Sequence, residues 1–162
     1  MTVTIKGLDH CLKRLQAMQK SMDDRLHELI EKLAEMGIEV ERAEFAKVAY
    51  DGEKDVSVGD VVWLNEKTAQ IIASGRTVLF LEFGSGTIGE GHERAAELGY
   101  GPGTWSDNEA LGGKGHWKDE GGWYYAHGKK SVGNRPARAV YQGGKTMRNS
   151  VASVAKEVFG HD

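Results

Sequence analysis

Residues 8–40 read LDHCLKRLQAMQKSMDDRLHELIEKLAEMGIEV, and this stretch decides the N-terminal half of the fold. Its large apolar residues recur every three or four positions, which places them on one face of an α-helix. They are Leu8, Leu12, Leu15, Met18, Met22, Leu26, Leu29, Leu33, Met36 and Val40. The pattern predicts an amphipathic helix over residues 7–41, opened by Asp9, because a negative charge is favourable in the first turn.

A helix of this length cannot bury its whole apolar stripe against one small sheet. Part of the stripe is therefore expected either to form an intramolecular core or to pack on a neighbouring subunit, and both readings stay open. Cys11, the single cysteine, excludes an intrachain disulfide and suits a reducing compartment. Because it falls within the apolar sector, we expect a small buried residue rather than a nucleophile.

After the helix the apolar period changes from 3.6 to 2, which predicts a sheet over residues 43–75. Phe45 and Tyr50 lead to Asp51-Gly52, a turn signal, and two further strands follow within 56–64 and 69–73. The expectation is a three-stranded antiparallel meander that ends at Gly75. The next segment, 77–86 (TVLFLEFGSG), is apolar on every face up to residue 83. It fits a strand or a buried helical turn equally well.

From residue 84 to residue 134 the composition shifts, because fourteen of the 22 glycines and three of the four tryptophans lie there. We expect a flexible loop over 87–134 that becomes ordered on assembly, since aromatic side chains supply contact area. The alternative is an inserted loop with one hairpin around residues 123–125. The candidate contacts to a partner or to other copies are Trp105, Trp117, Trp123, Tyr124 and Tyr125. A sugar-binding platform would use the same residues.

The last segment predicts a second amphipathic helix over residues 136–159. Pro136 suits a first helical turn, with Asn134 in front of it as a possible cap. The glycine pair 143–144 interrupts the apolar stripe, which indicates a kink or a close approach of two backbones. The whole chain, residues 1–162, then forms one α+β domain with a long N-terminal helix, a small antiparallel sheet, a Gly/Trp-rich loop and a C-terminal helix.

Composition narrows the classes of function. Apolar residues make up 40% and charged residues 28% of the chain, a profile typical of a soluble globular protein. The net charge of -3 does not favour nucleic-acid binding as a primary role, although nucleic acid could pass through a channel lined by several copies. No apolar run approaches the roughly 18 residues of a membrane span, and no secretion signal opens the chain, so we expect a cytoplasmic product without membrane contact.

The glycine-rich loop contains histidines and carboxylates, the side chains that bind zinc and other divalent metals. They are Glu90, His92, Glu93, Glu97, Asp107, Glu109, His116, Asp119, Glu120 and His127. Their spacing fits no metal motif, and the chain has no nucleophile elbow and no phosphate loop. We therefore expect no catalytic residues, no metal and no cofactor. A small metal-dependent hydrolase built on this loop is the alternative from another class.

Several motifs resemble those of one known family. Glu82-Phe83-Gly84-Ser85-Gly86 follows the apolar segment 71–81, and Tyr50-Asp51-Gly52 precedes Asp55-Val56-Ser57-Val58. Near the end, residues 133–137 (GNRPA) lead into the last helix, and residues 5–8 (IKGL) open the first. In this combination the chain is similar to the tailed-phage neck and tail-completion proteins of the HK-ninety-seven gene-product-ten type, also described as minor tail proteins. The family usually has threonine at position 85 and phenylalanine after the proline, and this chain has neither.

The resemblance implies a structural virion protein that joins head and tail as a ring, with six copies as the symmetry suggested by the family's tail context. It implies assembly in the host bacterial cytoplasm, a final location in the neck or tail, and contacts with itself and with other neck and tail proteins. It implies no enzymatic activity. A generic protein-interaction module, for example part of a toxin or virulence system, is the other alternative.

The structural motif consists of Glu82, Phe83, Gly84, Gly86 and Pro136. Glu82 follows a nearly wholly apolar segment, so if it is buried it needs hydrogen-bond donors. Backbone N–H groups or an arginine could supply them; the candidates are Arg76, Arg135 and Arg138. We expect Phe83 to fill the core and the two glycines to adopt backbone angles closed to other residues. The motif would then act as a buried hinge that aims the loop, and direct contact with a partner is the alternative.

Overall fold

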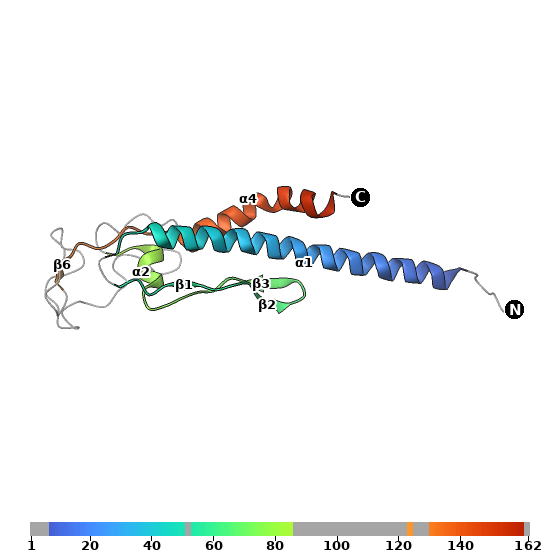
Figure 1. Cartoon of the computed structure of the whole chain (residues 1–162), viewed down its shortest axis with the longest axis horizontal. Helices are drawn as coiled ribbons and strands as arrows, with labels where there is room; N and C mark the ends of the chain where they lie inside the picture. Colours follow the sequence, from blue (N-terminus) through green and yellow to red (C-terminus); the bar gives the residue numbers. More distant parts are fainter. Residues whose placement is uncertain (1–6, 51–52, 86–122, 125–129, 161–162) are drawn as a thin grey trace.

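The computed structural model describes residues 7–50, 53–85, 123–124 and 130–160. The fold is α+β, as predicted (Figure 1). A long helix, α1, runs through the middle, the C-terminal helix α4 lies along one side of its second half, and a β-ribbon lies along the other.

Helix α1 spans Leu8–Lys47 and follows Gly7, which adopts a left-handed conformation with φ 92°. Asp9 lies in the first turn, as predicted. The predicted end at residue 41 is wrong, because the helix continues for six more residues. Phe45, expected in a strand, is helical and only 3% exposed. It lies one turn beyond Glu41 on the buried face, and no glycine or proline lies between Glu41 and Lys47 to end the helix, so packing overrides the short alternating pattern.

Four short strands form two two-stranded antiparallel sheets, which follow one another along a single β-ribbon. They are β1 (Ser57–Val58), β2 (Val62–Asn65), β3 (Thr68–Gln70) and β4 (Ala73–Ser74). Strand β1 pairs with β4, and β2 pairs with β3, with an irregularity between Trp63 and Asn65. The predicted three-stranded meander is therefore wrong: its first strand falls in the last residues of α1 and the coil after it, and the other two form a single hairpin.

Specific contacts hold the ribbon against α1. The Arg42 guanidinium donates a hydrogen bond to the carbonyl oxygen of Val58 at 2.9 Å. Near the ribbon tip the rings of His27 and Trp63 stack, with centroids 3.7 Å apart. At the C-terminal end of α1, the Lys54 ammonium donates to the carbonyl of Ala46 at 3.0 Å, which satisfies one of the orphan carbonyls of the helix end. The ribbon and the segment that leads into it are thus anchored at three places along α1.

Residues 78–83 form a short helix, α2 (Val78–Phe83), so the helical alternative for this apolar segment is correct. Leu81 in α2 and Ala139 at the start of α4 are completely buried. Together with Ile38, Phe45 and Val58 they form the centre of the core. The core therefore lies where the last turns of α1, the base of the ribbon, α2 and the first turn of α4 meet.

Helix α4 spans Ala139–Phe159, three residues shorter at its start than predicted. Arg138 precedes it with φ 56°, a left-handed conformation that separates Pro136 from the helix. Asn134 is not its cap. Strands β5 (Trp123–Tyr124) and β6 (Lys130–Ser131) pair as an antiparallel hairpin, which agrees with the hairpin expected around residue 123.

Candidate functional site

Glu82 caps a helix to which it does not belong. Its carboxylate lies at the end of α2, is 5% exposed, and accepts hydrogen bonds from the backbone N–H groups of Val140 and Tyr141 at 3.0 and 3.1 Å. These N–H groups lie in the first turn of α4, whose own preceding residue, Arg138, provides no side-chain cap. A carboxylate is favourable at a helix N-terminus both as an acceptor and as a negative charge. Of the donors considered for Glu82, backbone N–H groups are thus confirmed, and Arg76 instead binds Asp55.

The motif is joined to the start of α4 by backbone pairing as well. Ser85 and Asn134 form an isolated antiparallel bridge, with N···O distances of 3.0 and 3.1 Å in the two directions. The Asn134 amide donates to the carbonyl of Phe80 at 2.9 Å, and its oxygen accepts from the Ser85 hydroxyl. The Ala137 N–H donates to the carbonyl of Leu81 at 2.6 Å. We call this hydrogen-bonded unit, residues 80–85 with 134–141, the frame.

The remaining motif residues fall partly within the frame. Phe83 is 5% exposed and lies in the core region, as expected. Gly84 has φ 78° and ψ 175°, a conformation that disfavours any residue with a Cβ. Pro136 lies between the bridge and α4, outside the helix. Gly86 lies outside the described residues.

Glu41 is a second buried carboxyl, and the sequence offered only a weak signal for it. It is 3% exposed, on the face of α1 that carries Ile38 and Phe45, and it forms no hydrogen bond with a described residue. Burial and the negative charge of Glu82 raise its pKa to about 7. In the sequence, the only sign that Glu41 would be buried was its position one helical turn from Ile38 and Phe45, outside the predicted stripe.

The two long helices approach each other at a pair of glycines. A Cβ added to Gly143 of α4 would lie 2.7 Å from Cγ of Glu41 and 3.1 Å from the carbonyl oxygen of Gly37. A Cβ added to Gly37 would lie 2.8 Å from the sulfur of Met147. Of the two readings for the glycine pair 143–144, the close backbone approach is therefore the correct one at residue 143. Gly144 has open space around it.

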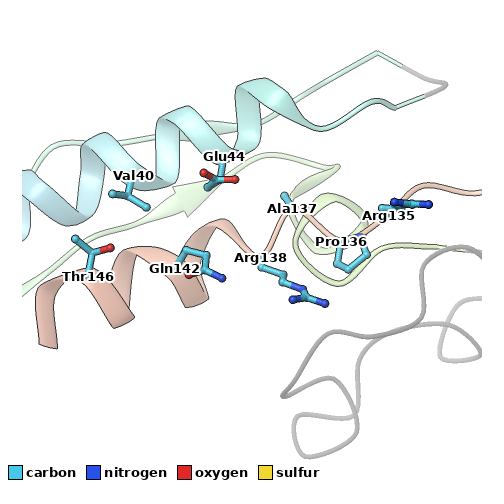
Figure 2. A pocket seen from close by; sticks show the side chains of 8 residues that line it. All are labelled: Val40, Glu44, Arg135, Pro136, Ala137, Arg138, Gln142 and Thr146. Atoms are coloured by element: carbon cyan, nitrogen blue, oxygen red, sulfur yellow. The ribbon is translucent and has the colours of Figure 1, made fainter. Parts of the chain in front are cut away.

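A groove of about 830 Å³ adjoins the frame (Figure 2). Val40 and Glu44 of α1 line one wall, and Gln142 and Thr146 of α4 line the other. At its end lie the four residues that connect the bridge to α4, Arg135, Pro136, Ala137 and Arg138. An acid, an amide and two guanidinium groups suit a polar or charged segment of a partner better than an apolar ligand.

The structure places only part of the aromatic set proposed as contacts. Trp123 and Tyr124 form β5, where their backbones pair with Ser131 and Lys130. Trp105, Trp117 and Tyr125 lie outside the described residues, as do all the histidines and carboxylates considered as metal ligands. Within the described part of the chain, no group of three or more such side chains could hold a metal ion.

The first half of the apolar stripe on α1 is uncovered. Leu8, Leu15 and Met22 are 51%, 56% and 58% exposed, and Cys11 is also exposed, which corrects the expectation of a buried cysteine. The reason is length: α4 and the ribbon reach only the second half of the helix, so burial of the stripe stops where they end. In the described ranges, no helix is both long and apolar enough to span a membrane.

Compared with models of protein families, with curated protein sequences and with solved structures, the chain matches none of them.

Proposed function

We propose that this chain is a structural subunit of a tailed-phage particle, a neck or tail-completion protein that assembles as a ring at the junction of head and tail. The observation that carries the proposal is the frame. The two motif segments on which the resemblance rests, 82–86 and 133–137, are far apart in the sequence. Through Glu82, Ser85 and Asn134 they meet in one hydrogen-bonded unit.

The frame has a consequence for the segment between these motifs. Ser85 and Asn134 are bridged, so the chain that departs after residue 85 returns to the same place at residue 134. A long segment with both ends fixed on a rigid scaffold is a common way to present partner contacts. Three of the four tryptophans lie in this segment, and aromatic residues are frequent anchors of interfaces.

The uncovered half of α1 favours the same class of function. An apolar helical stripe exposed over four turns is costly for a free protein and typical of a subunit that buries it in an assembly. The polar groove beside the frame would supply a second contact region on the opposite end of the same helix. Neither feature requires a catalytic group, in keeping with a structural role.

The test is a deletion of this gene in the genome that encodes it. Particles produced without the protein should accumulate as filled heads and separate tails in electron micrographs. The wild-type gene supplied in trans should restore joined particles. Joined particles in the deletion strain would overturn the proposal, and so would a genome without head and tail genes beside this one.

A point variant distinguishes the loss of a partner contact made by the loop from a loss of folding stability. Trp117→Ala should fail to restore joined particles while the purified protein keeps the melting temperature of the wild type. The matched control is Trp63→Ala, which removes the stack on His27 and should lower the melting temperature. Full restoration by Trp117→Ala would exclude that residue as a partner contact.

A further inference from the structure

The first half of α1 stands clear of the rest of the described chain. Every residue from 7 to 24 is exposed, and Figure 1 shows this part of the helix extending past the C-terminal end of α4 and past the ribbon tip. At 1.5 Å per residue, residues 8–24 project by about 25 Å. We call this segment the arm. Its large apolar residues are Leu8, Leu12, Leu15, Met18 and Met22, each between 48% and 64% exposed.

Within the chain, a helix covers the continuation of this stripe. Leu33 and Val40 of the stripe are half-buried and line grooves together with residues of α4. Helix α4 ends close to Lys32, whose ammonium lies 2.7 Å from the carboxylate of Glu157. Beyond the end of α4, the stripe is half-buried at Leu26 and Leu29 and exposed from Met22 to the start of the helix. What fits the uncovered part is another amphipathic helix on the same face.

The spacing of the uncovered residues identifies that helix. Leu8 and Met22 each lie seven positions from Leu15, and Leu12 and Met18 each lie three positions from it. The stripe is thus symmetric about Leu15. In a two-fold antiparallel pair centred on Leu15, each residue faces the one at the mirrored position of the other copy, so this spacing sets large apolar residues opposite one another. In such a pair every large apolar residue of the arm meets another.

We infer that the arm is a dimerisation helix, and that its partner is the arm of a second copy, antiparallel and centred on Leu15. A parallel pair conflicts with the fold, since α4 occupies the same face in both copies and would lie between the two helices. In the antiparallel pair the partner's Leu8 reaches only the level of Met22. About ten residues, or roughly 15 Å, then separate it from the level of Lys32, where α4 ends.

This inference goes beyond the proposed function and does not depend on it. It concerns the free protein, whichever larger structure the protein joins. A subunit whose arm is paired in this way would exchange the contact when it enters a ring.

The first experiment is light scattering on the full-length protein over a concentration series. The wild type should be a dimer that dissociates on dilution. Leu15→Glu should be a monomer, with a dissociation constant raised at least about 100-fold, because two carboxylates would face each other in an apolar contact. Ala17→Glu adds the same charge on the opposite face of the same turn and should leave the dimer intact. Unchanged tryptophan fluorescence would show that the body of each variant remains folded.

The second experiment tests the orientation with disulfides. In the antiparallel pair the two Cys11 residues lie about 12 Å apart along the helices, too far for a disulfide. Leu15→Cys in a Cys11→Ser background places two thiols on the symmetry axis and should give a covalent dimer with a mild oxidant. A wild-type monomer at every concentration, dissociation by Ala17→Glu, or crosslinking of wild-type Cys11 would overturn the inference. Discrete rings of the free protein that Leu15→Glu does not disturb would also overturn it. If Leu15→Glu abolishes the dimer and still restores joined particles, the dimer inference is supported and the neck proposal is unaffected.

Discussion

Glu82 lies at the end of α2, and its carboxylate accepts a hydrogen bond from the backbone N–H of Val140, 58 residues further along the chain, at 3.0 Å. The same carboxylate accepts from the next N–H as well. A side chain in the last turn of one short helix therefore caps the start of a long one. This arrangement couples the packing of α2 to the formation of α4, so a change at residue 82 should act on both.

Glu82→Ala should destabilise the protein by about 2 kcal/mol, because it leaves two part-buried N–H groups in the first turn of α4 without this acceptor. Urea unfolding followed by circular dichroism measures the change. Glu82→Gln is the matched control: its amide oxygen retains one acceptor, so the loss should be smaller. A Glu82→Ala variant as stable as the wild type would show that α4 does not need this cap.

The neighbouring glycines 143 and 144 should respond in opposite directions to alanine. Gly143→Ala places a methyl group against Glu41 and the backbone of Gly37, and should cost about 1–3 kcal/mol through overpacking. Gly144→Ala meets no atom within 4 Å and should stabilise by about 0.5–1 kcal/mol, because alanine favours a helix interior. Thermal unfolding of the two variants side by side checks both signs. Equal effects would contradict a close approach at Gly143 alone.

Glu41 should make stability fall as the pH rises from about 4.5 to about 7. Its pKa is raised from the ordinary value of 4.5 to about 7, first by burial and then by the charge of Glu82. Between these values the folded chain holds a proton that the unfolded chain has lost, so unfolding becomes easier with each increment of pH and the effect levels off above pH 7. The total is on the order of 3 kcal/mol.

Glu41→Gln isolates this contribution, because glutamine resembles the protonated acid in shape and stays neutral. The gain in the free energy of unfolding of Glu41→Gln over the wild type should be about 3 kcal/mol larger at pH 8 than at pH 4. Urea titrations at the two pH values give this difference, in which the contributions of other acidic groups cancel. A difference that is the same at both pH values would mean that Glu41 ionises normally in the folded protein.

Asn134 should be far more sensitive to substitution than an exposed asparagine. Asn134→Ala removes the donor to the Phe80 carbonyl and the acceptor for the Ser85 hydroxyl in a buried site, and should cost about 2 kcal/mol. Asn65→Ala removes one hydrogen bond to the Lys67 N–H in an exposed turn and should cost less than about 1 kcal/mol. Chemical denaturation of both variants tests the contrast. Equal losses would imply that the frame contributes no more than a surface turn.

The local sequence pattern was sufficient to predict the elements with strong periodicity. The 3.6-residue spacing from Leu8 onward predicted most of α1, and the apolar stripe before Phe159 predicted α4. The same reasoning failed at Phe45, where a few alternating residues suggested a strand. A short alternating run is compatible with a helix end, and only packing against the core decides between them.

By itself, the amino-acid sequence determined the two amphipathic helices, the need of Glu82 for donors, and the symmetric stripe of the arm, because each depends on spacing along one chain. Only the tertiary structure decided that Glu82 caps α4, that Asn134 pairs with Ser85, and that Glu41 is buried beside Gly143. These relationships join residues about 50 to 100 positions apart. Their energy comes from the exclusion of water and from donors on another element, and no local period records where those donors will lie.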